Sequence, residues 1–188
     1  NAAVLVKDGS TTTITGGTIT SDADGANGVF SYGGTGGQNG ASGDGTTVII
    51  RDTAITTTGN GSGGIMTTGG GVTYASNLTI ETSGRSSAAI RTDRGGGTVT
   101  VTGGSYSTDG TGSQAVYSTA DITVNDAKME STASQGVVVE GSNSVTLNNV
   151  NLTPDNNTKN SDKSDWYQAV MIYQSMSGDA SGTDSSFT

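Results

Sequence analysis

A two-residue unit, in which a small residue precedes a branched aliphatic one, recurs along the whole chain. Its seven copies are Ala3-Val4, Gly28-Val29, Gly64-Ile65, Ala89-Ile90, Ala115-Val116, Gly136-Val137 and Ala169-Val170. Successive copies lie 25, 36, 25, 26, 21 and 33 residues apart, which indicates a coil of 21 to 26 residues that two insertions enlarge. A self-similar period of this length is typical of a solenoid, in which each repeat forms one layer of a stack.

A second pattern lies between these units: alternating apolar residues, then a turn residue, then an apolar residue three positions later. The turn column contains Gly16, Asp52, Asn77, Gly103, Asp126 and Asn149. Glycine, asparagine and aspartate are the residue types that adopt a left-handed backbone conformation at the lowest cost. The alternation on both sides predicts two strands that meet at a tight corner, and the small-aliphatic unit predicts a third strand in each coil.

Strands that recur in the same order with short connections stack in parallel, about 4.8 Å apart. We therefore predict an all-β fold, a right-handed parallel β-helix of about seven coils that forms one domain over residues 1–188. Its handedness follows from the preference for right-handed crossovers and from the lack of a hexapeptide repeat. The inward columns are expected to be Val4, Val29, Ile65, Ile90, Val116, Val137 and Val170 on one wall, and Ile19, Ile55, Ile80, Tyr106, Met129 and Leu152 on another.

The coil length and the composition of these columns resemble the pectate-lyase-like right-handed β-helix superfamily, and within it the Gly/Thr/Asn-rich bacterial surface adhesins and autotransporter-like passengers. This resemblance implies an extracellular or bacterial cell-surface location, but it specifies a fold better than a function. Neither end of the sequence has the polar cap or helix that normally covers the last layer of a solenoid. We therefore expect a segment of a longer solenoid, or copies that associate end to end into a filament.

Composition narrows the possible functions. Only 30% of the 188 residues are hydrophobic and 31 are glycine, which fits a thin core shared by many layers. The chain has no cysteine and no histidine, so thiolate metal sites and the commonest general base are excluded. A net charge of −9 and a pI near 4.1 argue against binding to nucleic acid or to an anionic bilayer. No apolar run of about 18 residues is present, so no membrane insertion is expected.

If the aliphatic residue of each unit points inward, the next residue points outward. That outward column is Leu5, Phe30, Met66, Arg91, Tyr117, Val138 and Met171, and the column two positions later is Lys7, Tyr32, Thr68, Asp93, Thr119, Glu140 and Tyr173. A continuous apolar row on a rod indicates contact with a partner, such as a second rod laterally, or with a packed loop. The alternative is a local bulge that turns the row into core. The binding candidates in these columns are Phe30, Tyr32, Tyr117 and Tyr173.

Two insertions interrupt the coils, at residues 33–45 and 154–167, and insertions in solenoids form surface loops. The first has seven glycines among thirteen residues, and we interpret it as a loop with little chemistry. The second contains the only tryptophan, Trp166, followed by Tyr167 and surrounded by carboxylates and amides. This composition is typical of a sugar-binding loop, which makes Trp166 and Tyr167 further binding candidates. The alternative is that Trp166 covers a hydrophobic edge of the coil beneath it.

Polysaccharide lyases and glycoside hydrolases on the same fold are the enzymatic alternative. Hydrolysis needs a pair of carboxylates at a defined separation, and proton abstraction needs a positioned base. The acids here are dispersed, and the densest charged group, Arg91, Asp93 and Arg94, is typical of a solvated turn with its own ion pairs. Asp22 and Asp24 before Gly25 match only the opening of a calcium loop, so no cofactor is predicted, although Ca²⁺ stays possible there.

We therefore predict a protein that is not an enzyme, either an adhesin-like stalk or filament or a module that binds glycans or a host surface.

Overall fold

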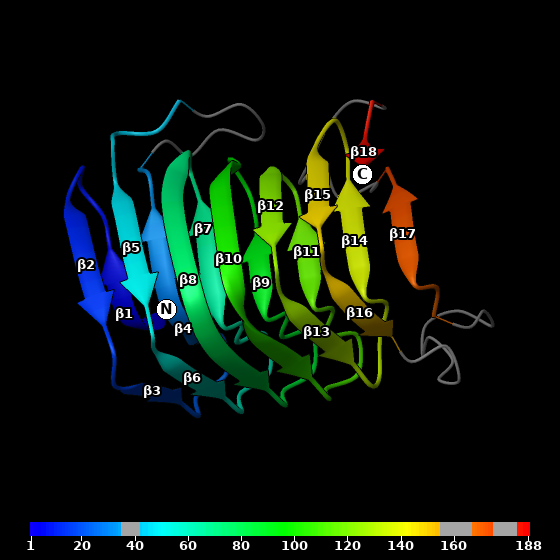
Figure 1. The fold of residues 1–188 in the computed structure, drawn as a ribbon. Coiled ribbons are helices and arrows are strands. Elements are labelled where there is room, and N and C mark those ends of the chain that lie inside the picture. Colours follow the sequence, from blue (N-terminus) through cyan, green and yellow to red (C-terminus); the bar gives the residue numbers. More distant parts are fainter. Residues whose placement is uncertain (35–41, 155–166, 175–183) are drawn as a thin grey trace.

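The computed structural model describes residues 1–34, 42–154, 167–174 and 184–188, and its regular elements in these ranges are all strands. Parallel strands form three walls around a narrow core, and successive coils lie side by side along a rod (Figure 1). The predicted parallel β-helix is confirmed, and the chain advances along the rod in the right-handed sense (Figure 1). No helix in the described ranges is long and apolar enough to span a bilayer.

The first wall is a sheet of seven parallel strands, which enclose six full turns, close to the predicted seven coils. Its strands in spatial order are β1 (Ala2–Val6), β4 (Asn27–Tyr32), β7 (Ile65–Thr68), β9 (Ile90–Thr92), β11 (Val116–Ser118), β14 (Val137–Glu140) and β17 (Val170–Tyr173). Each strand begins at or close to a small-aliphatic unit of the sequence. The small-aliphatic pattern therefore located the first wall correctly.

The second and third walls belong to one continuous sheet that bends at the turn column. The second wall contains β2 (Thr11–Thr15), β5 (Thr47–Arg51), β12 (Asp121–Asn125), β15 (Ser144–Asn148) and β18 (Ser186–Phe187). The third wall contains β3 (Thr18–Ser21), β6 (Ala54–Thr57), β13 (Lys128–Ser131) and β16 (Asn151–Pro154). Two longer strands, β8 (Gly71–Thr82) and β10 (Gly97–Thr108), cross the bend and contribute to both walls.

The turn column adopts the conformation that its residue types predict. All six members have positive φ: Gly16 (71°), Asp52 (53°), Asn77 (51°), Gly103 (69°), Asp126 (54°) and Asn149 (53°). The side-chain amide of Asn77 also donates a 2.8 Å hydrogen bond to Asp52 Oδ1 in the preceding layer, and Asn149 does the same to Asp126. The corner therefore turns the chain and also links neighbouring layers.

The sequence pattern predicted two separate strands on either side of every corner. In two coils the corner instead lies within a single strand. In β8 and β10 the parallel pairing resumes directly on both sides of the bend, with Ser76 opposite Thr102 and Leu78 opposite Gly104. The residues with positive φ, Asn77 in β8 and Gly103 and Gly104 in β10, change the strand direction without displacing the register. The two predicted strands of these coils are therefore one bent strand.

The core contains both predicted inward columns. Ile65, Ile90 and Val116 of the first wall are at most 1% exposed, and so are Ile80 and Tyr106 of the third. In the outer layers Val4, Ile19, Leu152 and Val170 pack against this core but are only partly buried. The small residue of each unit leaves room for these side chains. A Cβ at Gly64 would lie 2.4 Å from Ile80 Cγ2.

A ladder of buried serines closes each coil between the third and first walls. Ser62, Ser87 and Ser113 are fully buried, and the hydroxyl of each accepts a hydrogen bond from the backbone amide of Ala26, Ser62 or Ser87, respectively, in the preceding layer. Each hydroxyl also donates to a carbonyl, of Ala23, Gly59 and Gly84 in turn. The ladder satisfies backbone groups that lie where the strands are interrupted. The 25- and 26-residue spacing of these serines is a signal that the sequence analysis missed.

Candidate functional site

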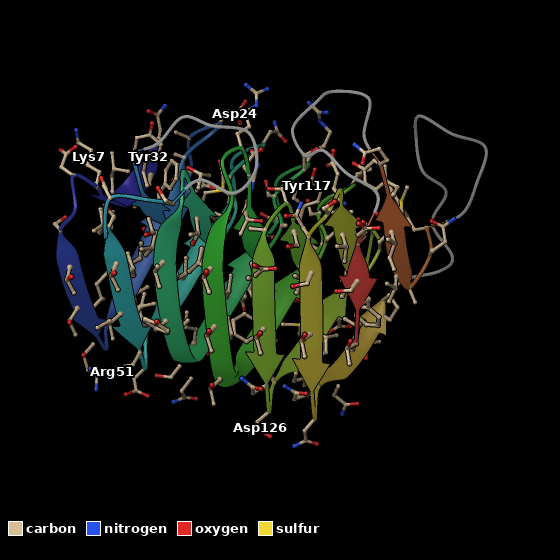
Figure 2. All side chains as sticks on the ribbon, turned by 90° about the horizontal axis from the view of Figure 1, so that it is seen from above. Lys7, Asp24, Tyr32, Arg51, Tyr117 and Asp126 are labelled. Atoms are coloured by element: carbon tan, nitrogen blue, oxygen red, sulfur yellow. The ribbon has the colours of Figure 1, made fainter. Side chains whose placement is uncertain are left out.

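The outer face of the first wall contains most of the predicted binding residues. The strand register places the first outward column in line, since Leu5 pairs with Phe30, Phe30 with Met66, and Met66 with Arg91. The column continues from Arg91 through Tyr117 and Val138 to Met171. Figure 2 shows Lys7, Tyr32 and Tyr117 along one edge of the rod, opposite Arg51 and Asp126. The register therefore aligns the first column as predicted, and in the second column it pairs Tyr32 with Thr68 and Glu140 with Tyr173.

The column is not a continuously exposed apolar stripe. Leu5 is 49% exposed, but Met66 and Val138 are only 7% and 2% exposed. A bulge does not explain this burial, because Val137 and Val139, on either side of Val138, are fully buried on the inner face. Val138 therefore points outward and is covered there. The part of the face that stays accessible is defined by aromatic and charged residues.

Phe30 and Tyr32 form an aromatic pair on β4. Their ring centroids lie 6.0 Å apart with an interplanar angle of 60°, an edge-to-face arrangement. Both rings are half-buried. Aromatic pairs prefer this geometry because the positive edge of one ring approaches the negative face of the other. The pair therefore forms a rigid apolar platform at one end of the face.

A groove of about 280 Å³ lies further along the same face. Its lining comes from β9, from β11 and from the segments that flank these strands: Ser86, Ala88, Arg91, Asp93, Gly112, Gln114 and Tyr117. The groove combines one aromatic ring with side chains that can donate or accept hydrogen bonds. A concave surface on which a few polar groups converge is one feature of ligand sites in proteins.

The charges of the groove are paired. Arg91 Nη2 lies 3.2 Å from Asp93 Oδ2, and the two side chains are 16% and 31% exposed. Arg91 Nη1 also donates a 3.2 Å hydrogen bond to the carbonyl of Gly61. The predicted ion pairing of this charged group is confirmed. Arg91, however, belongs to a strand and is largely buried, instead of lying in a solvated turn.

A buried glutamate lies directly beside the groove. Glu140 is 1% exposed, and its Oε2 accepts hydrogen bonds from the hydroxyls of Tyr117 and Tyr173. Its Oε1 is buried and has no hydrogen-bond partner within the described ranges. Burial, and next the hydrogen bond to Glu140, raise the pKa of Tyr117 well above its usual value of 10. The structure therefore brings together two predicted tyrosines from β11 and β17 around a carboxyl group on β14.

The sequence analysis did not identify Glu140, Gln114 or Ser86 as site residues. Glu140 was recognised only as one position of an outward column, where an acid is ordinarily solvated. Its position between two tyrosines of adjacent coils was the available signal. Gln114 and Ser86 lie in turns, outside the columns from which candidates were chosen.

Of the two candidates in the second insertion, only Tyr167 lies in the part of the chain that the structure describes. Tyr167 is only 5% exposed, and its hydroxyl lies 3.8 Å from the position that a Cβ on Gly112 would occupy. Trp166 lies outside the described residues, as do residues 155–165 and residues 35–41 of the first insertion. A binding role for Trp166 and Tyr167 stays a prediction.

No metal site is apparent in the ranges that the structure describes, since no group of three or more acidic, histidine or cysteine side chains gathers there. Asp24, from the partial calcium-loop motif, accepts a 2.8 Å hydrogen bond from the backbone amide of Asn60. This contact gives Asp24 a structural role in joining two layers.

Comparisons with known proteins give no family for this chain. No protein-family model, no curated protein and no solved structure matches it. The fold and site define a β-solenoid with an aromatic and polar groove on one wall.

Proposed function

We propose that this chain is a non-catalytic β-helical module of a secreted or bacterial surface protein, and that it binds carbohydrate on the outer face of its first wall. The observation that supports this proposal is the groove beside Tyr117, where an aromatic ring and a paired arginine on adjacent strands lie close to an amide from the preceding turn. Membership of the pectate-lyase-like superfamily is part of the same proposal.

Carbohydrate fits this groove because a sugar ring has apolar C–H surfaces as well as hydroxyl groups that both donate and accept hydrogen bonds. The ring of Tyr117 offers an apolar surface, and Gln114, Ser86 and Asp93 offer polar atoms. The aromatic pair on β4 lies three strand steps from β11 in the same sheet, about 14 Å at 4.8 Å per step. An extended oligosaccharide along the rod can therefore contact both places.

Binding is favoured over hydrolysis by the distribution of carboxyl groups. Among the described residues, Asp93 is the only acid that lines the groove, and it is paired with Arg91. Glu140 lies beside the groove, but it is buried behind Tyr117 with 1% exposure and does not reach the groove surface. Glycoside hydrolysis requires two carboxyl groups that both reach the scissile bond. A secreted polysaccharide lyase or glycoside hydrolase is the competing proposal.

The proposed experiment is a glycan array followed by calorimetric titration with wild-type protein and with Tyr117→Ala. We expect Tyr117→Ala to lower the affinity for the bound glycan at least tenfold, about 1.4 kcal/mol. Tyr74→Ala is the matched control, because Tyr74 is 50% exposed on the second wall. Gln114→Ala tests the groove without touching Glu140.

Equal binding by wild type, Tyr117→Ala and Gln114→Ala would contradict the proposal. Turnover is measured in parallel, as release of reducing ends or of unsaturated products, with and without Ca²⁺. Robust turnover that Asp93→Asn abolishes would favour the enzymatic alternative. Self-association, end to end or lateral, is a separate prediction, and sedimentation across a range of concentrations tests it.

A further inference from the structure

The charge pairing in the groove points to an uncharged saccharide as its ligand, in preference to an acidic one such as a uronate. This inference rests on the proposed carbohydrate-binding function and narrows its ligand class. It depends on how Arg91 is held, which is the only cation among the described residues that line the groove.

Arg91 is fixed by contacts on several sides. Its two terminal nitrogens donate hydrogen bonds of 3.2 Å each, one to Asp93 Oδ2 and one to the carbonyl of Gly61. Its aliphatic arm lies against Gly63, where a Cβ would be only 2.5 Å from Arg91 Cδ. The side chain is 16% exposed, so it cannot turn freely toward a ligand. The strand and the preceding turn therefore hold the guanidinium group in its pair with Asp93.

Asp93 is held equally well. Its Oδ2 contacts Arg91, and its Oδ1 accepts a 3.0 Å hydrogen bond from the backbone amide of Arg94. The other lining residues, Ser86, Gln114 and Tyr117 among them, are uncharged at neutral pH. The described lining residues therefore have no net charge between them. A carboxylate ligand would find no unpaired cation among these residues and would lie close to Asp93.

The field of the whole molecule acts in the same direction. The chain has a net charge of −9, which lowers the local concentration of anions at its surface. Neutral hydroxyl groups, in contrast, can accept from Arg91, Gln114 and Ser86 or donate to Asp93 without breaking the ion pair. Arg91 and Asp93 are therefore specificity-determining residues that select against acidic sugars.

The test compares matched oligosaccharides on the intact chain: cello-oligosaccharides with their C6-oxidised forms, and oligogalacturonates with their methyl esters. We expect Tyr117-dependent binding of uncharged members at least tenfold tighter than of their acidic counterparts. Asp93→Asn keeps the shape of the side chain but replaces one acceptor oxygen with an amide donor and leaves Arg91 without a charged partner, so we expect it to raise the affinity for the acidic member about tenfold. Arg91→Gln is the control and is expected to preserve the preference for the uncharged member.

The outcomes separate the two proposals. Tyr117-dependent binding of an acidic member as tight as that of its uncharged partner overturns this inference and leaves the carbohydrate-binding function standing. If no neutral or acidic glycan on the array binds in a way that depends on Tyr117, the proposed carbohydrate-binding function is overturned, and this inference with it. Thermal midpoints of Asp93→Asn and Arg91→Gln, measured first, identify a variant that fails to fold. In that case the wild-type comparison alone decides.

Discussion

The backbone amide of Ser87 donates a 2.8 Å hydrogen bond to the hydroxyl of Ser113, which lies one turn further along the rod. The same hydroxyl donates a 2.7 Å hydrogen bond to the carbonyl of Gly84, and Ser113 is fully buried. A single side chain thus satisfies a donor and an acceptor of the backbone between two layers.

Ser113→Ala is therefore expected to lower the free energy of unfolding by about 2 kcal/mol, because it leaves a buried amide and a buried carbonyl without their partner. Urea unfolding followed by circular dichroism measures the change. Ser105→Ala is the control, since Ser105 is exposed on β10, and its effect should stay within about 0.5 kcal/mol. Equal effects of the two substitutions would show that the ladder does not stabilise the fold.

Gly84→Ala tests how closely the layers approach at the same corner. A Cβ at Gly84 would lie 1.8 Å from the carbonyl oxygen of Gly59, so the turn must move, and we expect a loss of about 3 kcal/mol or more. Gly61→Ala is the comparison, because Gly61 has φ of 66° with nothing within 4 Å of the added Cβ. Its conformational cost should be about 1 kcal/mol. A similar thermal midpoint for both variants would contradict the close-packing explanation.

Asn77 tests the left-handed corner. Asn77→Gly keeps the positive φ and loses only an exposed 2.8 Å hydrogen bond to Asp52, so the free energy of unfolding should fall by about 0.5 kcal/mol. Asn77→Val places a β-branched residue at φ 51° and should cost about 2 kcal/mol. Chemical denaturation of both variants gives the difference. A valine variant as stable as the glycine variant would exclude backbone conformation as the reason for this column.

Alkaline pH should destabilise the protein. Burial raises the pKa of Tyr106 and of Tyr117 above the ordinary value of 10, so both keep their protons in the folded state when the unfolded chain has lost them. Their contribution is therefore complete below pH 10 and is lost as the pH rises above it. Each tyrosine adds a slope of up to about 1.4 kcal/mol per pH unit.

Unfolding in urea between pH 8 and pH 11.5 measures how the free energy of unfolding depends on pH. Tyr106→Phe should reduce this slope by the contribution of one tyrosine, up to about 1.4 kcal/mol per pH unit. Tyr106 is 1% exposed and its hydroxyl donates to the carbonyl of Gly103, so the phenylalanine variant also loses one hydrogen bond at every pH. An unchanged slope in Tyr106→Phe would mean that this hydroxyl ionises in the folded state as readily as in the unfolded chain.

The sequence was sufficient to predict the parts of the fold that repeat. Residues such as Asn77 and Gly103 have their conformation set within one coil, and Ile65 and Ile90 repeat the same inward environment in every layer. The candidate site was only partly predictable because it depends on differences between coils. Glu140 is buried by its neighbours on the outer face, and no periodic pattern encodes that covering. The groove likewise depends on turn residues such as Gln114, whose positions vary with loop length.

The bent strands β8 and β10 have a consequence for the order in which the molecule opens. Eleven register pairs join them on the two sides of the corner, whereas the first two coils share nine in all, five between β2 and β5 and four between β3 and β6. In a solenoid, opening proceeds by successive loss of contacts between neighbouring layers. Amide hydrogen exchange should therefore be slowest in β8 and β10 and faster in the layers on either side, which makes the middle of the rod the last part to unfold.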